Sequence, residues 1–339
     1  MKVYDSLTNL TDIAGPTAVA IGKFDGVHRG HQAVLARLVA LARRDRLMSI
    51  VLTFDRNPLE LFAPDRAPTP LVSPSQRLAL LAASGVDATV VVPFNRDFAA
   101  RSATDFVDQV LVERLHAAVV LVGRDFRYGA RAAGNVAQLA AAGTALGFAV
   151  QLVDDVDVAV GTSTPSHSVL VEPGFPLEGE GGVVREDPAS TRISSTLIRE
   201  LLTAGDVGAA SGLLGRLPRV SATIVHGAAR GRELGFPTAN LSPIVEGFIP
   251  ADGVYAGWLT DGGTKYPAAI SVGNNPTFEG MPQRQVEAYV LDETLELYGH
   301  LVDIDFAQRL RGQIEFTAVP ELIEQIAADV AATREFLLG

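Results

Sequence analysis

Residues 22–31 read GKFDGVHRGH, and this stretch decides the fold of the first half of the chain. It follows the apolar run Ala18–Ile21 and leads into residues 32–38, where apolar positions recur at the spacing of a helix. A strand, a tight turn and a helix in this order point backbone N–H groups and the positive end of the helix dipole at the turn. We therefore expect the turn to hold an anionic group.

The residues around this stretch alternate short apolar runs with helical patterns. Such alternation is typical of a parallel sheet with helices on both faces, which predicts a Rossmann-like α/β domain. The predicted strands are Ala18–Ile21, Ile50–Phe54, Thr89–Val92, Val119–Val122 and Ala149–Val153, and the predicted helices lie near 31–44, 75–84, 104–115 and 134–146. Open α/β sheets bind ligands beyond the carboxyl ends of their strands, and the turn at 22–31 lies there.

The pattern breaks down between residues 161 and 190, where Gly, Pro, Ser and acidic residues dominate. This composition predicts a long loop, with a hairpin that pairs Val169–Val171 with Val183–Arg185. After the loop, Ser194 or Ser195 is expected to cap a helix, and a second short helix follows at about 206–214.

From Pro218 onward the chain reads as a second domain of a different kind. Strand-like runs separated by Gly, Pro and Asp turns predict a small antiparallel β-barrel or sandwich, and the tail 320–338 predicts a terminal helix that docks on it. We expect domains at residues 1–217 and 218–339. The predicted strands are Val220–Val225, Gly253–Leu259, Ala268–Val272, Val286–Leu291 and Val302–Phe306, and the apolar face of the tail is Leu322, Ile323, Ile326, Val330 and Phe336.

Composition narrows the function classes. The 339 residues suffice for about two domains, and the formal net charge of −11 disfavours nucleic acid as the main partner. There is no cysteine, which excludes disulfides and thiolate chemistry, and no long uncharged apolar run or signal-like N-terminus, so we expect a cytoplasmic protein with no membrane span. Lysine occurs only at positions 2, 23 and 265, and no GxxxxGK[ST] motif is present, so phosphate chemistry must rest on Arg, His, backbone N–H groups and a metal ion.

The residues of the turn suit attack at the α-phosphate of a nucleoside triphosphate. His28 and His31 can stabilise charge on the transferring phosphoryl group, either as cations or as neutral donors. A second helix start, at 194–196, offers hydroxyl and N–H groups, and Arg192 and Arg199 beside it supply permanent positive charge.

These motifs resemble the nucleotidyltransferase superfamily and, more narrowly, the FMN adenylyltransferase half of bacterial FAD synthetases. The resemblance rests on residues 24–31, on Thr53-Phe54-Asp55 and on GRDFRYG at 123–129. It implies that His28, His31 and Arg199 are catalytic. The residues implied to bind ATP are Gly22, Phe24, Asp25, Gly30, Asp125, Arg192, Ser195 and Thr196, and those implied to contact the flavin are Phe62, Tyr128 and Asn57.

Two features depart from the pattern of that family. The family usually continues Thr53-Phe54-Asp55 with Pro-His-Pro, whereas this chain has Arg56-Asn57-Pro58. Asparagine replaces a hydrogen bond of the imidazole but neither its proton nor its charge, and Arg56 is a candidate to compensate. The loop at 161–190 is also longer than usual, which leaves open an idle surface insertion or a lid over the site.

A second set of motifs lies in the predicted barrel. Residues 227–240 read GAARGRELGFPTAN, in which three glycines four residues apart form a backbone cradle before two small oxygen donors, Thr238 and Asn240. Such oxygen ligands suit Mg²⁺, which is usually held by few protein ligands together with phosphates. Glu287 lies in an otherwise apolar strand, where it either faces solvent or serves as a general base in a pocket.

The barrel segments resemble riboflavin kinase. The resemblance implies that Thr238 and Asn240 bind Mg²⁺–ATP and that Glu287 takes the proton from the riboflavin 5′-hydroxyl. The residues implied to bind ATP are Gly227, Gly231, Gly235, Pro237, Thr238 and Asn240, and those implied to contact the flavin are Arg309 and Arg311.

The two resemblances cover nearly the whole chain in the order of that family, so we predict a bifunctional FAD synthetase. It would convert riboflavin and ATP to FMN and ADP in the barrel, and then FMN and ATP to FAD and pyrophosphate in the α/β domain, with Mg²⁺. The expected partners are the small molecules riboflavin, FMN and ATP, with a homo-oligomer allowed and neither nucleic acid nor membrane. Two alternatives remain open: a kinase with a weakened or inactive adenylyltransferase domain, and a non-catalytic flavin-binding regulatory module.

Overall fold

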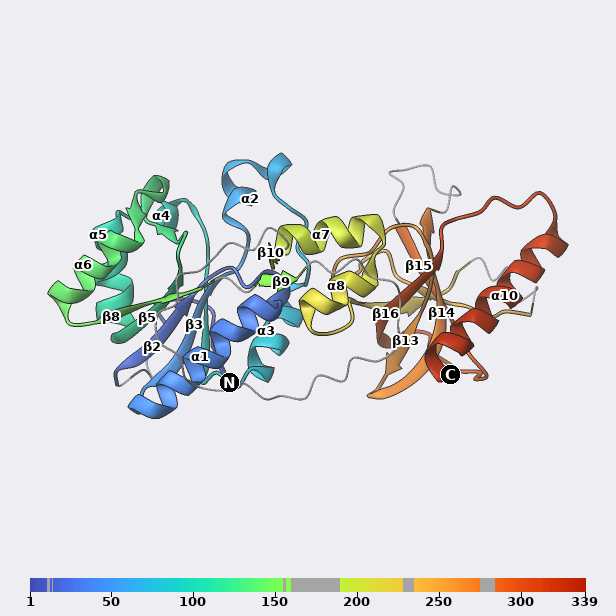
Figure 1. The fold of residues 1–339 in the computed structure, drawn as a ribbon, viewed down its shortest axis with the longest axis horizontal. Coiled ribbons are helices and arrows are strands. Elements are labelled where there is room, and N and C mark those ends of the chain that lie inside the picture. Colours follow the sequence, from blue (N-terminus) through green and yellow to red (C-terminus); the bar gives the residue numbers. More distant parts are fainter. Residues whose placement is uncertain (11–12, 14, 155–156, 160–189, 228–234, 275–283) are drawn as a thin grey trace.

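The computed structural model describes the chain from residue 1 to 339, except for residues 11–12, 14, 155–156, 160–189, 228–234 and 275–283. A parallel sheet with its helices forms one end of the molecule and a closed antiparallel barrel forms the other, with helices α7 (Ser195–Ala204) and α8 (Val207–Leu214) between them (Figure 1). The structure thereby confirms the predicted order along the chain: an α/β domain, then a barrel, then a terminal helix.

The first sheet has six parallel strands in the order β1-β4-β3-β2-β5-β8. Without the edge strand β1, the order along the chain is third, second, first, fourth and fifth, as in doubly wound folds. The direction of winding reverses between β2 and β5, so a ligand site is expected beyond the carboxyl ends of these two strands. The bounds are β1 Lys2–Tyr4, β2 Thr17–Ile21, β3 Met48–Phe54, β4 Ala88–Val92, β5 Ala117–Gly123 and β8 Ala149–Val153.

Helices cover both faces of this sheet because alternate residues of each buried strand point to opposite sides. Ala18 and Ala20 of β2 pack toward α1 and α3, whereas Val19 and Ile21 pack toward α6 and the π-helix at 106–114. The helices of this half are α1 Arg29–Asp45, α2 Pro58–Phe62, α3 Pro74–Ala83, α4 Arg96–Ala99, α5 Ala103–Asp105, the π-helix Phe106–Arg114 and α6 Val136–Leu146. Short strand pairs join β6 Arg127–Tyr128 to β7 Gly134–Asn135, and β9 Asp157–Ala159 to β10 Ser190–Arg192.

The structure differs from the predicted elements at a few places. The helix predicted at 104–115 is a short α-helix that continues as the π-helix, and strands β1 and β12 were not predicted because each has only three residues. Of the two candidates for the cap of α7, Ser194 is the cap, since its hydroxyl accepts from the N–H of Leu197 at 3.2 Å. The hairpin predicted within 169–185 lies outside the described residues.

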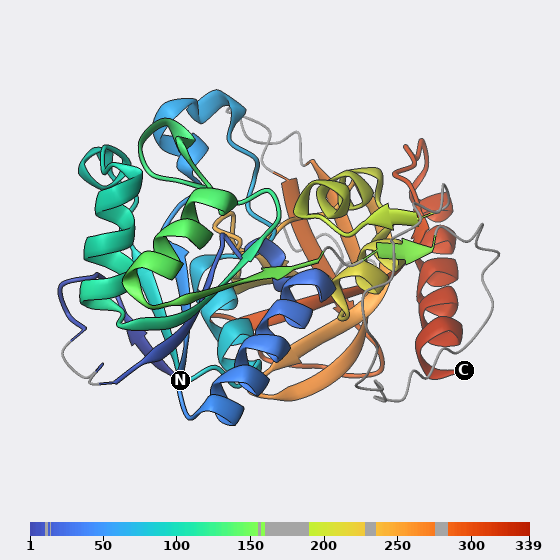
Figure 2. The same ribbon diagram turned by 60° about the vertical axis from the view of Figure 1, so that its left-hand side comes forward.

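The barrel closes in the order β11-β12-β15-β14-β13-β16, with antiparallel neighbours. Its bounds are β11 Arg219–Val225, β12 Ala239–Leu241, β13 Gly253–Asp261, β14 Thr264–Asn274, β15 Arg284–Val290 and β16 Leu301–Arg311. The terminal helix α10 (Val319–Leu338) packs against β13, β14 and β16, at the end of the molecule away from the parallel sheet (Figures 1 and 2). Leu322, Ile326 and Val330 line a cavity beside the barrel, whereas Ile323 and Phe336 of the predicted apolar face are exposed.

Helices α7 and α8 belong to the hydrophobic core of the barrel. Ile198 and Leu202 of α7, with Leu213 of α8, are buried in one cluster with barrel residues such as Tyr255 and Phe306. The two helices therefore pack on the barrel, although in the sequence they directly follow the α/β half. None of the helices within the described ranges is long and apolar enough to span a bilayer.

Candidate active sites

The turn after β2 has an unusual backbone. Phe24, Gly26 and Val27 all have positive φ angles, of 49°, 77° and 39°. A β-branched residue such as Val27 rarely adopts this conformation, which costs about 1–3 kcal/mol and persists where surrounding contacts over-determine it. Val27 and Phe24 are each only 2% exposed, so both side chains anchor the turn in the core beneath α1.

His28 caps α1 and stacks on His31, with ring centroids 3.7 Å apart and planes inclined by 20°. The N–H of His31 donates to His28 Nδ1 at 3.4 Å. Burial lowers the pKa of His28 to about 4, with further lowering by the charges of Arg216 and Arg192, and burial followed by the charge of His28 holds the pKa of His31 well below its usual range. The sequence left open whether these histidines are cations or neutral donors. Their lowered pKa values favour the neutral imidazoles at pH 7.

This lowered pKa makes the stability of the fold depend on pH. Below pH 6.5 the unfolded chain binds a proton at position 28 that the folded chain excludes, so the free energy of unfolding falls as the pH drops from 6.5 to about 4. One pKa unit corresponds to about 1.4 kcal/mol, which makes the contribution of His28 about 3 kcal/mol. Urea titrations at several pH values should show that the free energy of unfolding falls less steeply with decreasing pH in a His28→Asn variant than in the parent chain. An equal decrease in both proteins would contradict this assignment of the pH dependence to His28.

Several predicted ATP-binding residues converge on the turn. Arg199 of α7 forms an ion pair with Asp25 and donates through Nε to the carbonyl of Thr69 at 2.7 Å. Asp25 also accepts from the N–H of Leu71 at 2.9 Å, and its own carbonyl accepts from the Ser195 hydroxyl at 2.9 Å. The start of α7 is thus held directly on the turn, although 170 residues separate Asp25 from Ser195.

The other residues predicted around this turn take different positions. The Phe24 side chain lies in the core, so only its backbone is accessible to a ligand. A side chain at Gly30 would meet the His28 ring at 3.2 Å, and Asp125 lies 3.4 Å from Arg192, with both groups largely exposed. Gly22 is partly buried beside the ring of Phe24, and Thr196 is exposed in the first turn of α7.

A large aromatic cavity, of about 860 Å³, opens beside the carboxyl ends of β2 and β3. Phe62 and Tyr128, which the resemblance implies contact the flavin, both line it. Asn57 does not line it, because its side chain caps α2 by accepting from the N–H of Leu59 at 3.1 Å. The other aromatic residues that line the cavity are Phe54, Phe94, Phe98, Phe106 and Phe126, and its arginines are Arg96, Arg101, Arg127 and Arg131.

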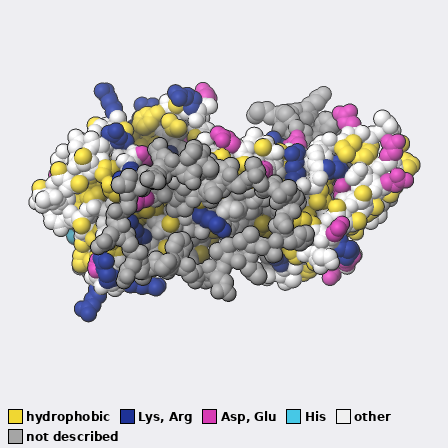
Figure 3. Space-filling view, viewed as in Figure 1, with side chains coloured by type: hydrophobic (Ala, Val, Ile, Leu, Met, Phe, Trp, Pro, Cys, Tyr) yellow, Lys and Arg dark blue, Asp and Glu magenta, His cyan; other side chains and the backbone are white. Residues whose placement is uncertain are grey.

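Sequence reasoning missed most of this aromatic cavity. The signal that could have found it is positional, since Phe54 ends β3 and Phe94 follows β4, and parallel strands end at the same edge of the sheet. Figure 3 shows hydrophobic side chains flanked by Lys and Arg side chains at this end of the molecule, over α2.

A second cavity, of about 310 Å³, lies between the barrel and α10. Glu287 lines it and accepts from the Thr238 hydroxyl at 3.1 Å, so this carboxylate faces a pocket rather than open solvent. Asn240 lies opposite Glu287 on the neighbouring strand β12. A side chain at Gly227 would come within 2.5 Å of the Asn240 amide, which explains glycine at this position.

The remaining barrel residues divide between this cavity and other places. Arg311 lines the cavity and is held by Asp329 of α10 through contacts of 2.7 and 2.9 Å. Arg309 instead donates to the carbonyls of Ala204 and Asp252, because a β-bulge between the two arginines changes the register of β16. Gly235 has a φ of 85° and Pro237 is exposed, while Gly231 lies outside the described residues.

Comparisons with known proteins agree with this geometry. A family model described as FAD synthetase matches residues 11–165, and one described as riboflavin kinase matches residues 214–337. Enzymes named bifunctional riboflavin kinase/FMN adenylyltransferase are 37% identical in Escherichia coli K12, over 99% of this chain and 98% of the relative, and 33% identical in Haemophilus influenzae, over 99% of each. A crystal structure described as a macrolide-efflux protein from Streptococcus pneumoniae has a TM-score of 0.80 and 29% identity over 98% of both chains.

The fold, the sites and these matches together define a transferase with two phosphate-transfer activities, one in each half of the chain. The chain belongs to the family of bifunctional riboflavin kinase/FMN adenylyltransferases.

Proposed function

We propose that residues 218–339 phosphorylate riboflavin and that residues 1–217 adenylylate the resulting FMN. The observation that carries the proposal is that each cavity lies beside a segment for which we propose phosphate binding. Glu287, Thr238 and Asn240 adjoin the barrel cavity, and the His28 turn follows Ile21, which itself lines the aromatic cavity.

In the kinase half, Glu287 removes the proton of the riboflavin 5′-hydroxyl. The alkoxide oxygen attacks the γ-phosphorus of ATP in line, the bond to the β-phosphate oxygen breaks, and FMN and ADP result. The oxygens of Thr238 and Asn240 fit a hard cation, and no group of three His, Cys, Asp or Glu side chains within the described ranges forms a metal cage. When bound there, Mg²⁺ would neutralise charge on the phosphates of ATP.

In the adenylyltransferase half, the phosphate of FMN is already ionised and attacks without a base. Its oxygen forms a bond to the α-phosphorus of ATP, and pyrophosphate leaves to give FAD. His28 and His31 act as uncharged hydrogen-bond donors, and Arg199 carries the positive charge that stabilises the transition state. The ring system of FMN stacks among the phenylalanines of the aromatic cavity, with arginines at its rim. Because both reactions consume ATP, we propose the cytoplasm as their location.

The competing function is a riboflavin kinase whose adenylyltransferase is weakened. It is favoured by one observation: Asn57 stands where the family usually has histidine, and its side chain is engaged in capping α2 together with Glu60. A non-catalytic flavin-binding module is a third candidate, which the residues around both cavities disfavour.

Incubation of the purified chain with FMN, ATP and Mg²⁺ separates these functions. We expect FAD and pyrophosphate in equal amounts, and, when riboflavin replaces FMN, release of ADP as well. Chelation of Mg²⁺ with EDTA should stop both reactions. ADP release from riboflavin without FAD would favour the weakened adenylyltransferase, and flavin binding without turnover of ATP would favour the regulatory module.

A further inference from the structure

Arg216 lies in the linker between α8 and β11, and its guanidinium reaches into the turn that carries His28. Nη2 donates to the carbonyl of Gly26 at 2.6 Å, and Nη1 donates to the carbonyls of Val27 and Leu214, each at 3.3 Å. Burial lowers the pKa of Arg216 to about 10, so the group keeps its charge at neutral pH. One side chain thus joins the end of α8 to the most strained part of the turn.

Three consecutive backbone carbonyls of the turn each accept a hydrogen bond from a side chain. The Ser195 hydroxyl binds that of Asp25, Arg216 binds that of Gly26, and Gln32 binds that of Val27 at 2.9 Å. In a planar trans peptide the N–H points away from the C=O of the same unit. Anchoring the Val27 carbonyl therefore directs the N–H of His28 to the opposite side, toward the start of α1, where a helix N-terminus would favour an anion.

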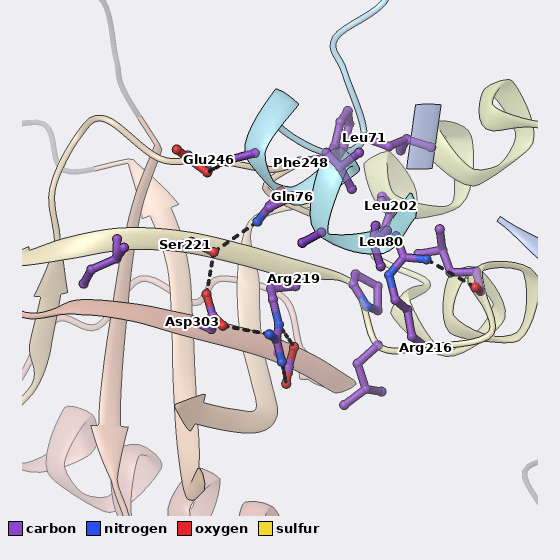
Figure 4. Close-up of a pocket in the computed structure, with 18 of the residues that line it drawn as sticks. Leu71, Gln76, Leu80, Leu202, Arg216, Arg219, Ser221, Glu246, Phe248 and Asp303 are labelled. Carbon is purple, nitrogen blue, oxygen red and sulfur yellow. Dashed lines mark hydrogen bonds and ion pairs between the residues drawn. The ribbon is translucent and has the colours of Figure 1, made fainter. Parts of the chain in front are cut away.

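The linker that carries Arg216 is also fixed to the barrel. Three residues further on, Arg219 donates to Asp305 at 2.7 and 2.8 Å and to Asp303 at 2.7 Å, both on β16. Figure 4 shows Arg216, in the linker, and Arg219, at the start of β11, pointing in different directions, with Arg219 on Asp303 and Arg216 pointing to the helices of the junction. Because α8 packs in the barrel core, both ends of this linker are anchored on the barrel.

We propose that Arg216 is a positioning residue for adenylyl transfer. It holds the turn at 24–28 in the strained conformation that receives the triphosphate, from an anchor that belongs to the barrel. The inference rests on the proposed adenylyltransferase activity and adds to it that Arg216, which clamps the turn, is itself anchored on the kinase half through the neighbouring Arg219. Contact with substrate is not part of this role, since Arg216 binds backbone carbonyls on the inner side of the turn.

The test compares Arg216→Met and Arg216→Lys with a control, Arg44→Met. Methionine removes both donors, and we expect kcat for FAD formation to fall about 100-fold, with KM for ATP changed less than about threefold. Lysine cannot bridge two carbonyls as the planar guanidinium does, so an intermediate loss of about tenfold is expected. Arg44 is exposed and pairs with its neighbour Asp45, so its replacement should change neither reaction.

Two further readouts separate positioning from folding. Riboflavin phosphorylation by the same variants should stay within about twofold of the parent chain, because Glu287 and its cavity lie on another side of the barrel. NMR titration should show a raised His28 pKa in Arg216→Met but not in Arg216→Lys, since the charge of Arg216, like that of Arg192, adds to burial in lowering the pKa of His28.

Unchanged kcat in both variants would overturn the inference, as would an equal loss of the kinase reaction or a His28 pKa that does not respond to Arg216→Met. Absence of FAD formation in the parent chain would instead refute the proposed adenylyltransferase activity. In that event the NMR titration still tests whether the guanidinium faces the turn.

Discussion

Replacement of Glu287 by glutamine should lower the rate of FMN formation about 10³-fold, within the range that a positioned general base contributes. Glutamine keeps the shape of the side chain and can still accept from the Thr238 hydroxyl, but it cannot take up the proton of the 5′-hydroxyl. FAD formation from supplied FMN should be unchanged in this variant. ADP release from riboflavin and FAD release from FMN, measured separately, give the two rates.

A matched substitution controls for the loss of a negative charge on the barrel. Glu293 is exposed in the segment after β15, and Glu293→Gln should leave both rates unchanged. Loss of both activities in a folded Glu287→Gln or Glu287→Ala protein would contradict the independence of the two sites. A decrease of less than about tenfold in FMN formation would contradict the role of Glu287 as the base.

Replacement of Arg199 by methionine should abolish most FAD formation, by about 10³-fold in kcat, because arginines that stabilise charge in phosphoryl transfer contribute at this scale. The same change removes the ion-pair partner of Asp25, a largely buried carboxylate, which should lower the free energy of unfolding by about 3 kcal/mol. Loss of activity alone would therefore not separate catalysis from folding.

A double variant makes this separation. Asp25→Asn keeps an oxygen for the N–H of Leu71 but carries no charge, so adding it to Arg199→Met should restore most of the lost stability. FAD formation should stay as low as in the single variant, while FMN formation remains normal in both. Recovery of FAD formation together with stability would show that Arg199 acts only through the fold.

The sequence predicts best those parts whose chemistry is local. The turn at 22–31 follows from its glycines, histidines and flanking apolar runs, and the barrel strands follow from short apolar segments between turn residues. Strands β1 and β12 escape prediction because three residues carry no period, and each pairs with a longer strand, β4 or β15. The π-helix at 106–114 buries Phe106, Val107, Val110 and Leu111, a spacing that an α-helix also produces, so the sequence does not distinguish the two.

Site residues can be predicted from the sequence when they lie in one short segment. They are harder to predict when folding brings them together from distant segments. Thr238 and Glu287 could be singled out from the sequence, but their contact depends on the closure of the barrel. Arg309 and Arg311 read alike in sequence, and only a bulge in β16 separates their directions. The uncharged state of His28 depends on burial and on Arg216, which is 188 positions away in the chain.

The two cavities proposed for flavin lie far apart in the molecule. One is lined by α2, α4 and the segment around Tyr128, and the other by β15 and α10, which occupy opposite ends in both ribbon views (Figures 1 and 2). Within one molecule, FMN formed in the barrel must therefore leave the barrel cavity before it is adenylylated at the other end. Any FMN that is released between the two reactions is open to capture by other FMN-binding proteins.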